Sequence, residues 1–252
     1  MAAASIAELI ERFKAESVRV SSIVYHAENA EDANNYVLKI AREHDVKRVV
    51  GSKSTAAEEI GLNKRLEDAG IEVTETGIER WIAQLAGERV SPENVERVAE
   101  LLSKAVGERL ESNPQVLLKA ARRCLRQSFL NADMGISGAN IAIAETSTLV
   151  IMDNEGNARL AAVLPPVHVA IVGCEKLVAT LGDATNIVKL LGKSDTGRKM
   201  PGYITYITGR STTADIPGAP MLPAQGPAEV HIVLLDSHKQ VAEFNQETYR
   251  LP

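Results

Sequence analysis

The chain has 252 residues, of which 45% are hydrophobic, and its formal net charge at pH 7 is −5. These values predict a globular protein that buries a large core as a single domain over residues 1–252. They argue against a nucleic-acid-binding protein, which would carry a basic stripe, and against a membrane protein, because no apolar run reaches the roughly 18–20 residues that a span needs.

The first third of the chain alternates between helical and strand patterns of apolar residues. The predicted helices are Ile6–Val20, a helix capped by Asn29, and Ser54–Ala69; the predicted strands are Ser21–Ala27, Val46–Gly51 and Ile71–Thr76. This β-α-β-α-β order predicts parallel strands that are joined by right-handed crossovers.

The middle of the chain has a helical pattern only, which predicts a helical insertion over about residues 77–133. Two helix starts are marked by a capping residue followed by proline, at Ser91-Pro92 and at Asn113-Pro114. Strands return after this insertion, so the fold class is α/β.

The last part of the chain alternates short apolar runs with turn residues. The predicted strands are Ile141–Ala144, Leu149–Met152, Val167–Val172, Tyr203–Thr208 and Glu229–Leu235. Helices are expected to start at Gly173-Cys174 and at Gly182-Asp183. Four prolines in Ser211–Pro227 predict a long irregular loop.

A polar loop, Gly51-Ser52-Lys53-Ser54-Thr55, joins a predicted strand to a predicted helix. Gly51 allows a tight turn, backbone amides at a helix start favour an anion, and Lys53 adds positive charge. The nucleotide-binding pattern Gly-x-x-x-x-Gly-Lys-Ser/Thr is absent. The loop is therefore either an anion site or an ordinary turn with Ser54 or Thr55 as the helix cap.

Two polar clusters lie among the later strands, and we expect them to meet at one ligand site. The first is Glu145-Thr146-Ser147-Thr148 and the second is Asn154-Glu155-Gly156-Asn157. A carboxylate in an apolar strand is costly unless it is paired. Glu145 is thus either a catalytic base or nucleophile, or a carboxylate that pairs with an arginine or caps backbone. Glu155 is either catalytic or a solvent-exposed turn acid.

Four other polar residues are candidates for ligand binding. Asn140 and Asn157 either hold a substrate or satisfy loop backbone. Arg159 either clamps a carboxylate or lies at the surface in an ion pair. His168 lies inside an apolar run. It is either a substrate-binding residue or a histidine that is hydrogen-bonded within the core.

Metal-binding patterns are not found in the sequence. The two cysteines, Cys124 and Cys174, lie far apart, which favours a reducing, cytoplasmic location and two buried small residues. Two thiols do not supply the roughly four thiolates of an iron–sulfur cluster. The other histidines show no metal-ligand spacing, so we predict no metal site.

Several segments in order resemble the LUD (lactate utilisation) domain family. They are Gly51–Ser54, Glu58–Asn63, Leu66–Val73, Ser137–Asn140, Ala144–Thr146, Asn154–Leu160, Leu164–His168, Glu175–Val178, Thr180–Leu181, Tyr206–Gly209 and Gly226–Asp236. The resemblance implies an α/β/α sandwich of three layers, similar to the NagB/RpiA/CoA-transferase group. Sugar-phosphate isomerases of that group bind phosphate on a strand-to-helix loop that Gly51–Thr55 resembles. CoA transferases of the group use a glutamate nucleophile, for which Glu145 and Glu155 are loose analogues.

LUD domains with helices in their middle resemble the N-terminal half of the iron–sulfur subunit of LutABC-type lactate oxidation systems. This implies a cytoplasmic binding and assembly module for a small anionic substrate, with the other subunits of such a complex as partners. An iron–sulfur cluster is expected on a C-terminal continuation or a partner, and none on this chain. A self-contained enzyme for an acyl-CoA or a sugar phosphate, and a non-catalytic interaction domain, stay open, and a homo-oligomer is compatible with all three.

Overall fold

The computed structural model describes residues 5–91, 93–191, 200–212 and 225–236. Most of the loop predicted over Ser211–Pro227 lies outside the described residues. The helices are α1 (Ile6–Arg19), α2 (Ala30–Glu43), α3 (Thr55–Glu59), α4 (Leu62–Asp68), α5 (Ile78–Ala86), α6 (Val95–Val106), α7 (Pro114–Asn131), α8 (Asn157–Val163) and α9 (Leu181–Leu191), with a 3-10 turn, η1 (Cys174–Lys176). The strands are β1 (Ile23–Ala27), β2 (Arg48–Gly51), β3 (Glu72–Glu75), β4 (Met134–Gly138), β5 (Ile141–Ile143), β6 (Thr148–Asp153), β7 (Val167–Gly173), β8 (Leu177–Val178), β9 (Tyr203–Thr208) and β10 (Glu229–Leu235).

A six-stranded parallel sheet forms the centre, in the order β1-β10-β7-β4-β2-β3. The expected parallel strands are present, but β1 and β2 lie far apart because β10, β7 and β4 enter between them. Residues of β7 alternate between the two faces of the sheet. Val169 and Ile171 pack into one apolar core, and Ala170 and Val172 pack into another. A strand buried on both faces is typical of parallel sheets covered on both sides.

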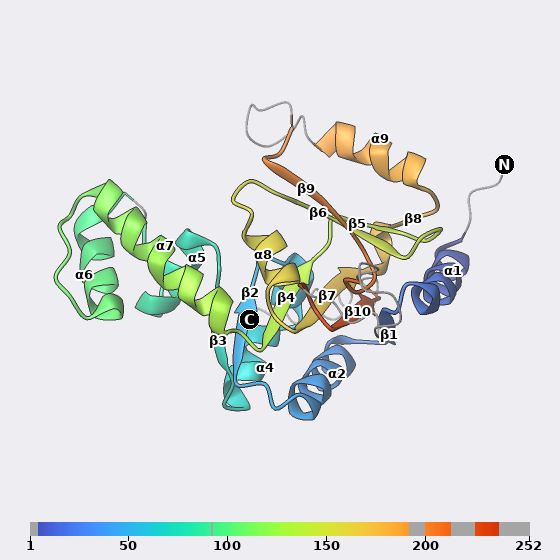
Figure 1. Cartoon of the computed structure of the whole chain (residues 1–252), viewed down its shortest axis with the longest axis horizontal. Coiled ribbons are helices and arrows are strands. Elements are labelled where there is room, and N and C mark those ends of the chain that lie inside the picture. The colour runs from blue at the N-terminus through green and yellow to red at the C-terminus, as the bar shows by residue number, and fades with distance from the viewer. Residues whose placement is uncertain (1–4, 92, 192–199, 213–224, 237–252) are drawn as a thin grey trace, which may run out of the picture.

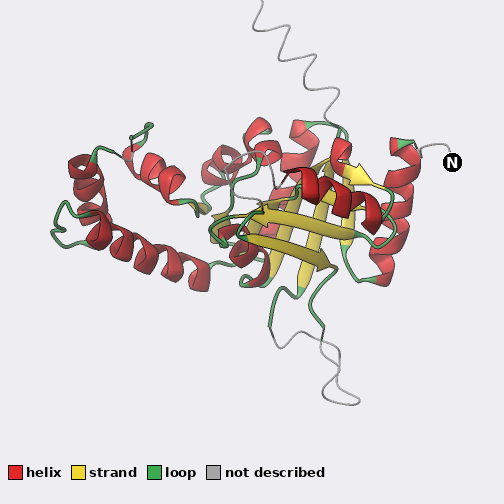
Figure 2. Ribbon diagram, turned by 90° about the horizontal axis from the view of Figure 1, so that it is seen from above, coloured by secondary structure: helices red, strands yellow, loops and turns green. Residues whose placement is uncertain are grey.

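The two faces of the large sheet are covered by different structures. Helices α2, α3 and α4 pack on the first face. The second face packs against α1 and a small sheet, β8-β5-β6-β9, whose strands cross the large sheet in Figure 2. Helix α9 then covers the outer face of the small sheet. The predicted three-layer α/β/α sandwich is therefore incomplete, since a mixed four-stranded sheet forms an additional layer on one side.

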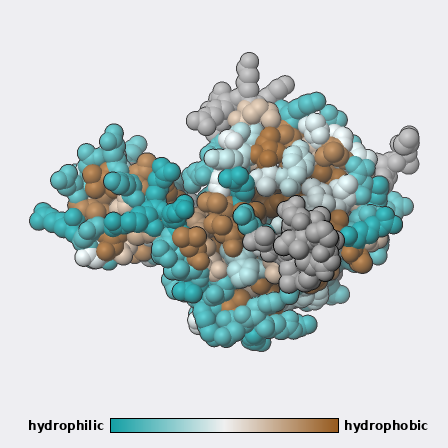
Figure 3. All heavy atoms as spheres, in the orientation of Figure 1, coloured by the Kyte–Doolittle hydropathy of each residue, from teal (hydrophilic) through white to brown (hydrophobic). Residues whose placement is uncertain are grey.

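Helices α5, α6 and α7 form the insertion that the sequence predicts over residues 77–133. They project from the β3 side of the large sheet and enclose an apolar core of their own around Trp81, Leu102 and Leu117. In Figure 3 brown atoms lie between the helices of this lobe, and its rim is hydrophilic. Helix α6 begins at Val95 with Asn94 as its cap, later than the predicted start at Ser91-Pro92.

Other predicted boundaries change for local reasons. The helix expected over Ser54–Ala69 is divided at Gly61, whose φ of 62° is left-handed and ends α3 before α4 begins. The helix expected from Gly173-Cys174 is only the turn η1, which leads directly into β8. Helix α8 is not anticipated by the sequence. It starts where the Asp153 carboxylate accepts hydrogen bonds from the amides of Gly156 and Arg159.

Candidate functional site

A pocket of about 550 Å³ opens at the carboxyl ends of β2, β4 and β6, where the insertion begins. Its lining combines the predicted polar loop with residues of later strands: Ser52, Lys53, Ser54, Thr55, Gly77, Ile78, Glu79, Arg80, Gly138, Ala139, Asn140, Ile151, Met152, Asp153, Asn154, Glu155, Asn157, Ala158 and Lys176. This volume suits a small-molecule ligand.

The pocket lies where the order of the parallel strands reverses. From β2 the chain runs outward to β3, and it then returns to place β4 on the other side of β2. The loops that leave β2 and β4 therefore diverge, which opens a crevice beyond their carboxyl ends. Ligands of open α/β sheets bind in such crevices.

The loop Gly51–Thr55 combines structural and exposed groups. The amide of Ser52 donates to the carbonyl of Ile136 at 2.9 Å, and the hydroxyl of Ser54 accepts from the amide of Ala57 at 3.2 Å. Both serines are buried. Ser54 caps α3, as expected if the loop is an ordinary turn into a helix. Lys53 and Thr55 remain exposed and line the pocket.

The pocket is lined by equal numbers of positively and negatively charged side chains, but not all of these side chains form ion pairs. The carboxylate of Asp153 is used by the start of α8, and Arg80 forms ion pairs with Glu58 and, at 3.8 Å, with Glu75. Within the described part of the chain, Lys53 and Lys176 have no ion-pair or hydrogen-bond partner. The carboxylates of Glu79 and Glu155 line the same pocket and also have no such partner among these residues, so the two ammonium groups are available to a carboxylate or a phosphate that binds on their side of the pocket.

Glu145 and Thr146 lie away from this pocket, so the two polar clusters do not meet. Strands β5 and β6 form an antiparallel hairpin, in which Glu145 belongs to the turn and Glu155 follows the far end of β6. The six residues of β6 separate the clusters by roughly 17 Å along the strand. Thr146 bonds the hydroxyl of Thr148 at 2.7 Å. Of the two catalytic candidates, only Glu155 lines the pocket.

Glu145 has two structural partners. Its carboxylate accepts from the amide of Leu181 at 2.5 Å, at the first turn of α9, and lies 3.9 Å from the guanidinium of Arg12. These contacts agree with the alternative in which this carboxylate caps backbone and pairs with an arginine.

We expect Glu145→Ala to lower the free energy of unfolding by about 1 kcal/mol, because the start of α9 loses its acceptor. Glu145→Gln, which keeps an acceptor oxygen, should retain most of the stability. Urea titrations of both variants and titrations with the pocket ligand measure this. Unchanged stability with a loss of ligand affinity would assign Glu145 to the site instead.

The other candidates divide between the pocket and the core. Asn140 and Asn157 line the pocket, and the Asn140 side chain accepts from the amide of Met152 at 2.7 Å, so it satisfies the backbone of strand β6 rather than that of a loop. Arg159 is exposed, outside the lining, with its guanidinium 5.2 Å from the centre of the Tyr203 ring. His168 is fully buried in β7 and bonds the hydroxyl of Ser137 at 2.8 Å.

Two cationic lining residues are missing from the sequence-based candidates. Lys176 follows β7 in the turn η1, which the sequence pattern suggests as a helix, and Arg80 belongs to the first turn of the insertion. Both follow the carboxyl end of a parallel strand, and that position is the signal that could have found them. Burial raises the pKa of the Glu75 carboxyl group, and the positive charge of the neighbouring Arg80 opposes this rise.

The residues of the chain do not fit an iron–sulfur cluster. Cys124 packs against the core of the helical insertion, and Cys174 lies in the core on the second face of the large sheet. Two thiols in separate cores do not ligate one cluster. The part of the pocket lining that the described residues form contains no cysteine or histidine. None of the described helices is both long and apolar enough to span a membrane.

The comparisons with known proteins agree with one another on the family that this chain resembles. A family model described as the LUD domain matches residues 10–235. Lactate utilization protein B of Shouchella clausii (strain KSM-K16) is 39% identical over 222 residues, and that of Geobacillus kaustophilus (strain HTA426) is 36% identical. The uncharacterized electron transport protein YkgF of Escherichia coli (strain K12) is 34% identical over 223 residues. Each alignment covers 85% of this chain but only 45% of the relative, so the chain spans less than half their length.

One solved structure shares the fold. A crystal structure of a DUF162 family protein from Deinococcus radiodurans superposes with a TM-score of 0.54 at 16% sequence identity. The superposition covers 92% of this chain and 99% of the other. At this identity the likeness shows the fold alone.

Proposed function

We propose a function from the premise that this chain belongs to the LUD domain family. The pocket at the carboxyl ends of β2, β4 and β6 binds a small carboxylate, lactate or a related hydroxy acid. The chain acts in the cytoplasm as a binding and assembly module of a hydroxy-acid oxidation system, beside the electron-transfer parts of that system.

The observation that carries the proposal is a pair of lysines that have no ion-pair or hydrogen-bond partner among the described residues. Lys53 and Lys176 come from loops after β2 and β7, on either side of β4, and both line one pocket. A carboxylate between them gains two charge-assisted hydrogen bonds. The amide and hydroxyl groups of Asn157 and Thr55 are available for the hydroxyl of a hydroxy acid. The names of the curated relatives, lactate utilization protein B, support this ligand class.

Electron transfer is assigned to other parts of the system. Hydroxy-acid oxidation needs an acceptor for two electrons, and the two cysteines of this chain do not form a cluster site. An iron–sulfur cluster on a partner subunit, or on a region that follows this domain, would supply that acceptor. The greater length of the relatives leaves room for such a region in them. In this arrangement the chain orients the substrate and contacts the other subunits of a LutABC-type complex.

A second function is supported by Glu155. It lines the same pocket as Lys53, so a carboxylate is available beside a bound anion for nucleophilic or acid–base chemistry. Combined with the resemblance to the NagB/RpiA/CoA-transferase group, this supports a self-contained enzyme for a sugar phosphate or an acyl-CoA. Fold similarity alone does not choose between the two functions.

A thermal-shift panel distinguishes these functions. The purified chain is heated with L-lactate, glycolate, ribose 5-phosphate or acetyl-CoA. A ligand at 100 times its dissociation constant stabilises the folded protein by about 2.7 kcal/mol. We expect the two hydroxy acids to raise the melting temperature. A shift with only the sugar phosphate or acetyl-CoA would support the enzyme, and no shift with any of the four would contradict both functions.

A further inference from the structure

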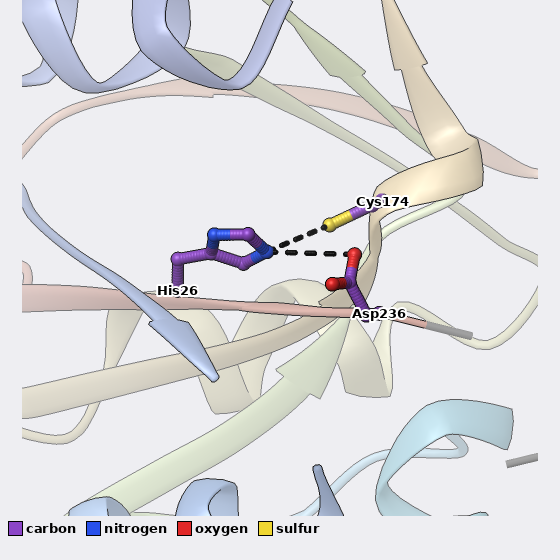
Figure 4. Close-up of side chains that lie close together, drawn as sticks. All are labelled: His26, Cys174 and Asp236. Carbon is purple, nitrogen blue, oxygen red and sulfur yellow. Dashed lines mark hydrogen bonds and ion pairs between the residues drawn. The ribbon is translucent and has the colours of Figure 1, made fainter. Parts of the chain in front are cut away.

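Three potential metal ligands meet at the carboxyl edge of the large sheet, on the half away from the pocket. They are His26 of β1, Cys174 after β7 and Asp236 after β10. Strand β10 lies between β1 and β7, and Leu235 pairs with both Ala27 and Gly173. The three side chains therefore extend from adjacent strands at nearly the same height. Figure 4 shows them directed toward one another.

The separation between His26 and Asp236 is long for a nitrogen–oxygen hydrogen bond, whereas that between His26 and Cys174 is within the range of hydrogen bonds to sulfur. Cys174 Sγ lies 3.8 Å from His26 Nε2, and Asp236 Oδ1 lies 3.5 Å from the same nitrogen. Ordinary hydrogen bonds from nitrogen to oxygen measure about 2.9 Å. Zinc bonds of about 2.0–2.3 Å set ligand separations of roughly 3.3–3.6 Å in a tetrahedron. The cluster is thus spaced like the ligands of a metal ion.

The geometry also excludes a catalytic Cys-His-Asp relay. In such a relay the cysteine and the acid use opposite nitrogens of the imidazole ring. Here both converge on Nε2, as the two dashed lines in Figure 4 show.

We propose that His26 Nε2, Cys174 Sγ and a carboxylate oxygen of Asp236 bind one divalent cation of the zinc class. Nitrogen, thiolate and carboxylate ligands together are typical of zinc. Three protein ligands leave a fourth position for water or an anionic ligand. Cys174 is buried, but the side chains of His26 and Asp236 are 29% and 37% exposed, so an ion reaches the site from solvent. The thiol proton leaves to solvent when the ion binds.

A second cluster, His44, Glu229 and His231, provides a comparison at the opposite edge of the sheet. One oxygen of Glu229 lies 3.2 Å from Nε2 of each histidine, within hydrogen-bond range. The hydroxyl of Tyr36 lies 3.1 Å from Nδ1 of His231. These groups satisfy one another without an ion, so we assign no metal to them. Neither assignment depends on the function proposed for the pocket.

The test is metal titration of the full chain after treatment with a chelator. We expect wild-type protein to bind one equivalent of Zn²⁺ in competition with a chromophoric chelator. Its Co²⁺ form should show a thiolate-to-cobalt charge-transfer band. Cys174→Ala and His26→Ala should each lower the Zn²⁺ affinity by about 100-fold or more, and Cys174→Ala should abolish the band. Circular dichroism checks that both variants are folded.

Two matched controls keep the assignment falsifiable. Cys124→Ser, which removes the other thiol, and His44→Ala, which removes one histidine of the second cluster, should both retain the band and the affinity. If wild-type protein binds no Zn²⁺, or if Cys124→Ser or His44→Ala removes binding while Cys174→Ala keeps it, the site is not the one proposed. The charge-transfer band of wild-type protein tests thiolate ligation even if a Cys174 variant fails to fold.

Discussion

Gly135→Ala is expected to lower the free energy of unfolding by about 3 kcal/mol or more, at the upper end of overpacking effects. Gly135 lies in β4 directly beneath α8. A methyl group at this position would lie 1.8 Å from the carbonyl oxygen of Ala161 and 3.0 Å from the ring of Pro165. A backbone carbonyl does not move as a flexible side chain does, so α8 as a whole must shift.

Gly51→Ala is the matched control on the neighbouring strand β2. Among the described residues a methyl group there meets only Asn63, at an ordinary 4.0 Å, so stability should change by less than about 1 kcal/mol. Equilibrium urea unfolding of both variants measures the difference. Because α8 contributes Asn157 and Ala158 to the pocket, Gly135→Ala should also weaken ligand binding. Equal stability of the two variants would show that α8 does not pack on β4 as described.

His168 should make the protein less stable as the pH falls from about 6.5 to 4. Burial, together with the nearby His231, lowers the pKa of His168 to about 4. Its Nε2 faces the hydroxyl of Ser137, and its Nδ1 has no partner among the described residues. A protonated ring would place an unpaired N–H at Nδ1. Between the two pKa values the unfolded chain binds a proton that the folded chain does not.

The expected loss of unfolding free energy over this pH range is about 3 kcal/mol, from 1.36 kcal/mol for each unit of pKa shift. It is absent above pH 6.5 and complete near pH 4. Burial also lowers the pKa of His231, which adds a loss of the same sign. The difference between wild-type protein and His168→Gln isolates the contribution of His168. Urea unfolding of both at pH 7, 5.5 and 4 measures it, and parallel pH profiles would contradict a buried neutral His168.

Local patterns were sufficient for most elements of the fold. The strands β7, β9 and β10 are apolar runs bounded by turn residues, and the cap of α7 is marked by Asn113-Pro114. The loop after β2 can be recognised in the sequence because a strand that turns tightly into a helix start has a distinct pattern. Four of its members, Ser52–Thr55, line the pocket.

Long-range geometry accounts for what the sequence did not reveal. Glu145 and Glu155 are near in sequence, but the hairpin of β5 and β6 places them at opposite ends of one strand. Conversely, His26, Cys174 and Asp236 are distant in sequence, and only the order β1-β10-β7 brings them together. The additional layer formed by the small sheet depends on which face β5 and β6 cover, and periodicity alone does not encode that choice.

Binding of L-lactate to wild-type protein and to Lys53→Ala, measured by isothermal titration calorimetry, tests the central claim most directly. Lys119→Ala, an exposed lysine on α7 outside the pocket lining, is the control. Loss of one charge-assisted hydrogen bond should weaken binding about tenfold in Lys53→Ala, while Lys119→Ala binds as wild type does. No heat of binding with wild-type protein, or equal dissociation constants for all three proteins, would contradict a hydroxy-acid site in this pocket.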